Sequence, residues 1–228
     1  MQVVERACMR NSKNHLNASA RRMRVGLSAA VCALAACVLP ATALGANDTT
    51  QFSVTAGSLS LTANPNVPDL PGLTLNGSAQ TLNAQMSNFT VADATGSAAG
   101  YNVTVVGDSS GSNSSRFKQY NTSTGSYGSV LLAQNSLTLN STGALISAQG
   151  GTTGTAPTHQ CNSGCFVDAA PGAPVKVVSA ATGAGMGTFQ ANTYSASSLS
   201  FAAPSTIQAL GANEVYRVNL VWSLNSGP

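Results

Sequence analysis

Apolar and polar residues alternate in short runs along most of the chain after residue 46. Phe52 and Val54 alternate with small polar residues, and Leu59 and Leu61 do the same. Further runs with this pattern are 73–75, 82–91, 101–106, 129–139, 175–179, 189–201 and 215–224. Runs of this length with a period of two predict β-strands whose apolar residues share one face.

Turn-forming residues separate these runs, and no stretch after residue 46 has a helical period. Short strands divided by Gly, Ser, Asn, Pro and Asp are typical of antiparallel folds rather than alternating strand–helix units. We therefore predict an all-β protein, with residues 47–228 forming a single antiparallel, Greek-key-like β-sandwich. Residues 107–115 and 150–157 are expected to be surface loops. Asp93 and Asp108 flank one predicted strand and are expected to be turn residues.

The first 46 residues have the layout of a secretory signal peptide with an extended basic region, 1–46. An uncharged apolar stretch, 25–39, follows a basic cluster and precedes small residues, which suits cleavage after Ala43 or Ala46. The stretch is shorter than the ~20 residues that a spanning helix needs. We expect a signal helix and no stable membrane span after cleavage.

An alternative reading of this region is lipidation at Cys37. Leu34-Ala35-Ala36-Cys37 has the form of a bacterial lipobox. The residues after Cys37 continue the apolar run toward a second cleavage site, where a lipoprotein normally enters a polar tether. The layout therefore favours ordinary cleavage and leaves lipidation as the alternative.

The charges are few and unevenly placed. Charged residues make up 7% of the chain, and six of the ten basic residues lie before residue 25. After residue 46, four basic and six acidic residues leave a net charge of −2. The basic character belongs to the predicted signal, so we expect no nucleic-acid partner.

Two cysteines, Cys161 and Cys165, lie after residue 46. In an exported domain this pair predicts a disulfide around a small turn, which shapes the loop more than it stabilises the fold. The alternative is a metal site that adds His159 and Asp168. Structural zinc usually takes four ligands from two well-spaced pairs, so the disulfide is favoured and no metal or cofactor is expected.

No set of residues has the spacing of a known catalytic motif. His159 is the single histidine after residue 46, and it lies in a Gly/Thr-rich stretch where we expect a loop. A catalytic histidine needs a nucleophile and an orienting group within reach. We predict a non-enzymatic protein. A secreted hydrolase would instead require His159 in a cleft against an acid and a hydroxyl group.

The run 215–224 contains Trp222, the single tryptophan of the chain. With a period of two, one face is entirely apolar or aromatic and consists of Tyr216, Val218, Leu220, Trp222 and Leu224. This predicts that Trp222 and Leu224 point into the core. The alternative is an exposed ring that stacks on a sugar. If Trp222 is buried, its truncation is expected to cost about 3–5 kcal/mol.

Three segments carry a resemblance to a known family. The segment Tyr216-Arg217-Val218-Asn219-Leu220-Val221-Trp222-Ser223-Leu224 resembles the closing motif of the WxL-domain proteins of Gram-positive bacteria. Residues 89–105 are similar to the internal stretch of that family, with Tyr101-Asn102-Val103 in place of its first Trp-x-Leu. Residues 52–61 fit its opening hairpin, so the resemblance spans about residues 47–228.

The resemblance implies an exported, all-β protein that binds the cell wall non-covalently, with peptidoglycan as the ligand. It implies that Tyr101, Val103, Trp222 and Leu224 fix the fold and border the binding surface. The expected partners are peptidoglycan or other surface proteins, and the expected location is the cell surface. Because alternation places Trp222 in the core, wall contacts are expected on neighbouring loops and exposed faces. The alternative function is a structural subunit of a pilus-type or spore-coat-type assembly.

Overall fold

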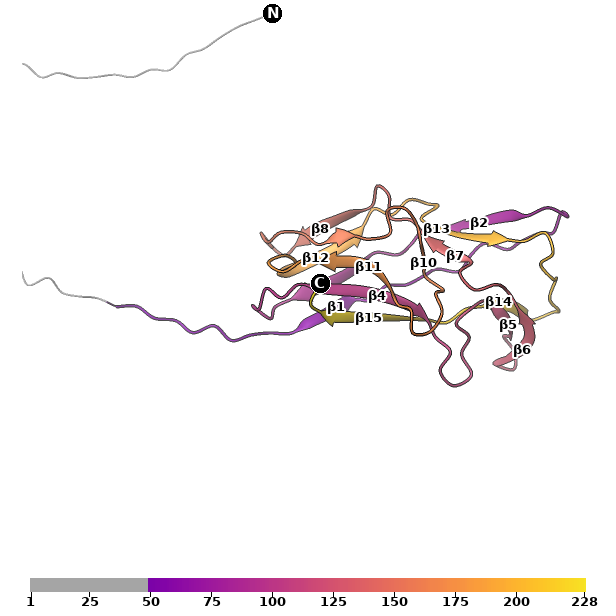
Figure 1. The fold of residues 1–228 in the computed structure, drawn as a ribbon, viewed down its shortest axis with the longest axis horizontal. Coiled ribbons are helices and arrows are strands. Elements are labelled where there is room, and N and C mark those ends of the chain that lie inside the picture. The colour runs from indigo at the N-terminus through magenta and orange to yellow at the C-terminus, as the bar shows by residue number, and fades with distance from the viewer. Residues whose placement is uncertain (1–48) are drawn as a thin grey trace, which may run out of the picture. The chain divides into compact units, whose positions relative to one another are not determined.

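The computed structural model describes residues 49–228, in which every regular element is a β-strand (Figure 1). All strand pairs are antiparallel, which confirms the predicted all-β sandwich class. The predicted signal helix and its cleavage site lie outside the described residues. No helix able to span a membrane occurs within residues 49–228.

Two four-stranded sheets form one half of the described fold (Figure 1). The first sheet has the order β1 (Leu59–Ala63), β3 (Phe89–Asp93), β12 (Gly187–Asn192) and β8 (Leu145–Gln149). The motif sheet has the order β15 (Leu220–Ser226), β4 (Tyr101–Gly107), β11 (Val175–Ala180) and β9 (Thr158–His159). Their neighbouring strands come from distant parts of the chain, as in Greek-key-like connections.

Two further sheets form the other half (Figure 1). The third sheet has the order β10 (Cys165–Phe166), β7 (Leu137–Leu139), β13 (Leu199–Ala203) and β2 (Gln80–Ala84). The small sheet has the order β14 (Glu214–Arg217), β5 (Lys118–Asn121) and β6 (Ser126–Leu131).

One hydrophobic core joins the first, motif and third sheets, and the small sheet packs against it through the partly buried Tyr216. Phe89 and Val91 enter it from the first sheet and are at most 2% exposed. Tyr101, Val103 and Val105 enter it from the motif sheet and are fully buried. These residues follow the period of two in their strands, so alternation is what places them inward.

Four of the predicted strands are each two strands in the structure. The run 82–91 divides into β2 and β3, 129–139 into β6 and β7, 189–201 into β12 and β13, and 215–224 into β14 and β15. In the first case Met86 N–H donates to Ser198 Oγ (2.9 Å), so the chain leaves strand pairing between β2 and β3. In the third case Thr193 has φ 58°, a left-handed turn that alternation does not show.

Two of the predicted strands are not strands in the structure, so these predictions are wrong. Phe52 and Val54 lie outside any strand and are 90% and 83% exposed. Residues 73–75 also form no strand, because Leu73 packs against the core from a loop. Strands β5, β8, β9 and β10 were not predicted; β9 and β10 have two residues each, which is too short for alternation to show.

The predicted loops and turns are confirmed. Residues 108–115 and 150–157 contain no strand, whereas Gly107, the first residue of the predicted loop 107–115, is the last residue of β4. Asp93 Oδ1 accepts a hydrogen bond from Thr95 N–H (3.0 Å), and Asp108 Oδ1 accepts one from Ser110 N–H (2.8 Å). Both aspartates therefore close local turns through their own side chains.

Candidate functional site

The two motif-like segments lie side by side in the motif sheet (Figure 1). Strand β15 pairs with β4 over its whole length, with Leu224 opposite Val103 and Trp222 opposite Val105. Tyr101 is opposite Ser226 at the end of the pair. The structure thus brings together the four residues that the resemblance implied.

Tyr101 and Val103 lie in the core and are surrounded by other parts of the fold. Both are fully buried. A Cβ atom built on Gly185 would lie 2.6 Å from Tyr101 Cε1, so a glycine is needed where the chain crosses the ring. Burial raises the pKa of Tyr101, and the nearby carboxylate of Asp93 raises it further. Neither residue is accessible to a ligand.

Trp222 and Leu224 are half-buried and pack against the core. The indole ring is tilted against Phe89, with 6.2 Å between the ring centroids. The predicted inward direction is therefore correct, but the burial is incomplete because β15 is the last strand of its sheet. The partly exposed indole lines an adjoining groove.

This groove has a volume of about 1070 Å³. Its walls come from the Pro-rich stretch 65–73, from the connection between β14 and β15, and from the small sheet. Among the apolar side chains that line it are Val67, Leu70, Leu73, Leu82, Phe117, Phe201, Ile207, Leu220 and Trp222. Polar and charged side chains also line it, among them Asp69, Gln208, Glu214 and Arg217. A largely apolar hollow with some polar groups is a common form of binding site.

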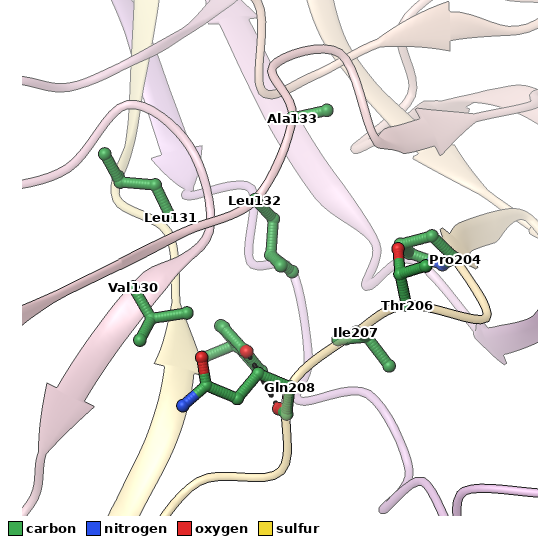
Figure 2. A pocket seen from close by; sticks show the side chains of 9 residues that line it. Val130, Leu131, Leu132, Ala133, Pro204, Thr206, Ile207 and Gln208 are labelled. Atoms are coloured by element: carbon green, nitrogen blue, oxygen red, sulfur yellow. Dashed lines mark hydrogen bonds between the residues drawn. The ribbon is translucent and has the colours of Figure 1, made fainter.

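A smaller hollow of about 350 Å³ adjoins the groove and shares Ile207, Gln208 and Tyr216 with it. Figure 2 shows Val130 and Leu132 on one side and Ile207 on the other. Tyr216 Oη donates a hydrogen bond to the Gln208 carbonyl (2.9 Å), which fixes the wall between the two spaces.

Two cations and two tyrosines form a basic–aromatic patch on the small sheet: Lys118, Tyr120, Tyr127 and Arg217. The tyrosine rings meet edge to face, with centroids 5.0 Å apart. The Arg217 guanidinium lies 4.5 Å from the centre of the Tyr120 ring, and Lys118 Nζ lies 5.7 Å from that of Tyr127. Tyr120 and Arg217 also line the groove, so the patch continues it.

Strand pairing in the small sheet determines which charged and polar side chains are neighbours in the patch. Arg217 lies directly opposite Lys118, and Gln119 Nε2 donates to Glu214 Oε1 (2.9 Å). Burial raises the pKa of Tyr127, and the neighbouring Arg217 opposes that rise. The patch was not predicted, because its members are spread over 118–127 and 217 in the sequence.

The predicted disulfide between Cys161 and Cys165 is present. Just before it, β9 pairs with β11 of the motif sheet, and Cys165 itself lies in β10, which pairs with β7 of the third sheet. The ring therefore ties two sheets together at one corner.

The alternative metal ligands do not gather around these cysteines. Asp168 is fully buried and accepts hydrogen bonds from Ser136 N–H and Oγ–H (both 2.9 Å) and from Leu137 N–H (3.1 Å). Within residues 49–228 no three His, Cys, Asp or Glu side chains are placed to hold a metal ion. Asp168 instead connects the chain to the start of β7.

His159 lies in strand β9, so the prediction that it lies in a loop is wrong. Its ring meets Tyr194 edge to face at 5.5 Å, and its Nε2 lies 3.4 Å from the Leu145 carbonyl. Burial lowers the pKa of His159, and the contact with Leu145 opposes that change. An aromatic ring and a main-chain carbonyl are packing contacts rather than a nucleophile and an acid.

The groove and the patch are therefore the surface features best suited to recognition in the described part of the chain. Comparison of the sequence and the structure with protein-family models, curated proteins and solved structures gave no match.

Proposed function

We propose that this protein is a secreted, non-enzymatic surface protein that associates non-covalently with the bacterial cell wall, with peptidoglycan as its ligand. The observation that carries the proposal is the position of the basic residues. Arg116, Lys118 and Arg217 are three of the four basic residues after residue 46, and all three lie in or beside the small sheet. Lys118 and Arg217 contact tyrosine rings there.

The chemistry of the surface suits a polymer of sugars and carboxylates. Tyrosine and tryptophan rings offer an apolar face with a polar end, and peptidoglycan offers the apolar faces of its sugar rings. Lysine and arginine form charge-assisted hydrogen bonds with carboxylates such as those of the peptide stems. The groove offers both, because Trp222, Tyr120 and Arg217 are among its lining residues, beside the carboxylates of Asp69 and Glu214.

The resemblance to WxL-domain proteins supports the same location and ligand. Within this proposal Tyr101, Val103 and Leu224 hold the motif sheet together, and Trp222 alone among the four also borders the groove. The binding residues are then Trp222, Tyr120 and Arg217, with Lys118 and Tyr127 beside them.

A sedimentation assay with purified cell-wall sacculi tests the proposal. Residues 52–228 form one compact unit, so a protein of residues 47–228 contains the whole surface. We expect it to pellet with the sacculi, and we expect K118Q/R217Q to pellet at least about tenfold more weakly, because two charge-assisted contacts are lost.

The fourth basic residue provides the matched control. Lys176 is exposed on β11, outside the groove and the patch, so K176Q is expected to pellet like the original protein. Complete recovery of the original protein in the supernatant, at low and moderate salt, would contradict wall binding. An equal loss in K176Q and K118Q/R217Q would contradict the proposed site.

A further inference from the structure

The segment 52–56 is a strand-like stretch without a strand partner. Its residues Phe52, Val54 and Ala56 alternate with Ser53 and Thr55, and all five are exposed. Phe52 and Val54, at 90% and 83% exposure, are the two most exposed large apolar side chains in the described part of the chain.

The chain becomes anchored directly after this segment. Gly57 N–H donates to the Ala94 carbonyl (2.8 Å), and Ala94 N–H donates to the Ser58 carbonyl (3.1 Å). These bonds extend the pairing of β1 with β3 by two residues and then stop. The apolar side of 52–56 is therefore left in solvent beside a firmly held strand, a costly arrangement unless another surface covers it.

Strand β15 is an open edge of the motif sheet, because it pairs with β4 alone. At its two ends Asp108 N–H donates to the Asn219 carbonyl (2.8 Å) and Gly227 N–H donates to the Gly100 carbonyl (2.9 Å). In an antiparallel pair, alternate residues direct their main-chain groups to the same neighbour. Odd-numbered residues from 219 to 227 therefore face β4, and the main-chain groups of Leu220, Trp222 and Leu224 face the free edge.

The side chains of β15 also favour the addition of a strand. Leu220, Trp222 and Leu224 face the core yet remain half-buried, although β1 of the first sheet lies near β15. Natural sheets usually protect an edge with charges, proline or short length. The seven residues of β15 contain no charge and no proline, and no other edge strand in residues 49–228 is as long.

We propose that segment 52–56 of one molecule adds as a strand to the free edge of β15 in a second copy. Main-chain hydrogen bonds would form along Leu220, Trp222 and Leu224, and Phe52 and Val54 would cover the exposed part of the indole and its neighbours. Each copy offers one segment and one edge, so the contact is head-to-tail and the assembly grows by repetition. This goes beyond wall binding and does not depend on it; because both contacts would use the exposed part of the Trp222 indole, a copy whose β15 edge is occupied would bind the wall through the other groove and patch residues.

The full-length chain can be tested by light scattering after size-exclusion chromatography over a range of concentrations. We expect the mean mass to rise with concentration. The substitutions F52S/V54S are expected to raise the dissociation constant at least about a hundredfold, because two apolar side chains lose their burial. The matched control S53A/T55A changes the opposite side of the segment and is expected to assemble like the original chain. All three proteins carry the same residues 1–48.

Trp222 reports directly on the proposed edge, because it is the only tryptophan. Its fluorescence is expected to shift to shorter wavelength as the original chain assembles, and to stay unchanged in F52S/V54S. A constant monomer mass would overturn the proposal, and so would equal assembly of F52S/V54S. Assembly without a fluorescence shift would assign the contact to another edge. At constant monomer mass, emission at a shorter wavelength in the original chain than in F52S/V54S would show that the segment covers β15 of its own chain.

Discussion

Tyr101 and Tyr194 bring hydroxyl groups into the core, and within the described residues neither hydroxyl has a hydrogen-bond partner. Burial raises the pKa of both tyrosines, and Asp93 raises that of Tyr101 further. An unfolded tyrosine ionises near pH 10, whereas the folded residues hold their protons to higher pH. Because the unfolded chain releases these protons first, the two groups leave stability unchanged below about pH 10 and lower it as the pH rises above that value.

We predict that the free energy of unfolding falls above about pH 10 and falls less steeply in Y101F/Y194F. At neutral pH the double variant is expected to be as stable as the original protein or more stable, because it removes two unpaired buried hydroxyls. Urea unfolding at pH 7 and at several values above pH 9 measures both effects. Identical pH dependence in the two proteins would show that these tyrosines are not responsible.

For single residues, the sequence predicts which way a side chain points better than it predicts how deeply that side chain is buried or what it contacts. Alternation correctly placed Trp222 toward the core, but it could not show that β15 is an edge strand and that the ring is only half-buried. The role of Asp168 was also not predictable, because its donors Ser136 and Leu137 lie more than thirty residues away in the sequence. The pairing of Cys161 with Cys165 was predictable because it is local.

Among the elements, the division of 215–224 into β14 and β15 has the largest consequence. The alternating pattern continues through Val218 and Asn219, so the sequence predicts one strand, yet β14 and β15 belong to different sheets. Asn219 explains the break. Its main chain bonds to Asp108 and Ser114 (both 2.8 Å), and its side-chain oxygen accepts a hydrogen bond from the Tyr127 hydroxyl.

We predict that N219A lowers the free energy of unfolding by about 1–3 kcal/mol, because it leaves the half-buried Tyr127 hydroxyl without its acceptor. The variant N219D keeps a side-chain oxygen at this position and is expected to lose less. Urea unfolding measures the two effects, and hydrogen exchange of residues 118–131 shows whether the small sheet has become looser. Equal losses in N219A and N219D would contradict a role for the oxygen.

For the whole molecule, the fold class was predictable and the arrangement of strands was not. Short alternating runs and scarce helical periodicity are local properties, so they are visible in the sequence. Which strands pair depends on contacts between distant residues. The basic–aromatic patch shows this clearly, because Lys118 and Arg217 become neighbours only through the pairing of β5 with β14.

Three sheets share one core, and the small sheet packs against it through the partly buried Tyr216, which determines how the molecule should unfold. Phe89 of the first sheet contacts Trp222 of the motif sheet, and Phe117, next to the small sheet, meets Phe201 of the third sheet with centroids 4.8 Å apart. Within residues 49–228 there is a single buried cluster, so the small sheet has no separate core of its own. We therefore predict a single cooperative transition, in which Trp222 fluorescence, tyrosine absorbance and far-ultraviolet circular dichroism coincide in urea. If the tyrosine signal of the small sheet changed at lower urea than the Trp222 signal, the small sheet would be an independent unit, and the patch could not be held rigidly beside the groove.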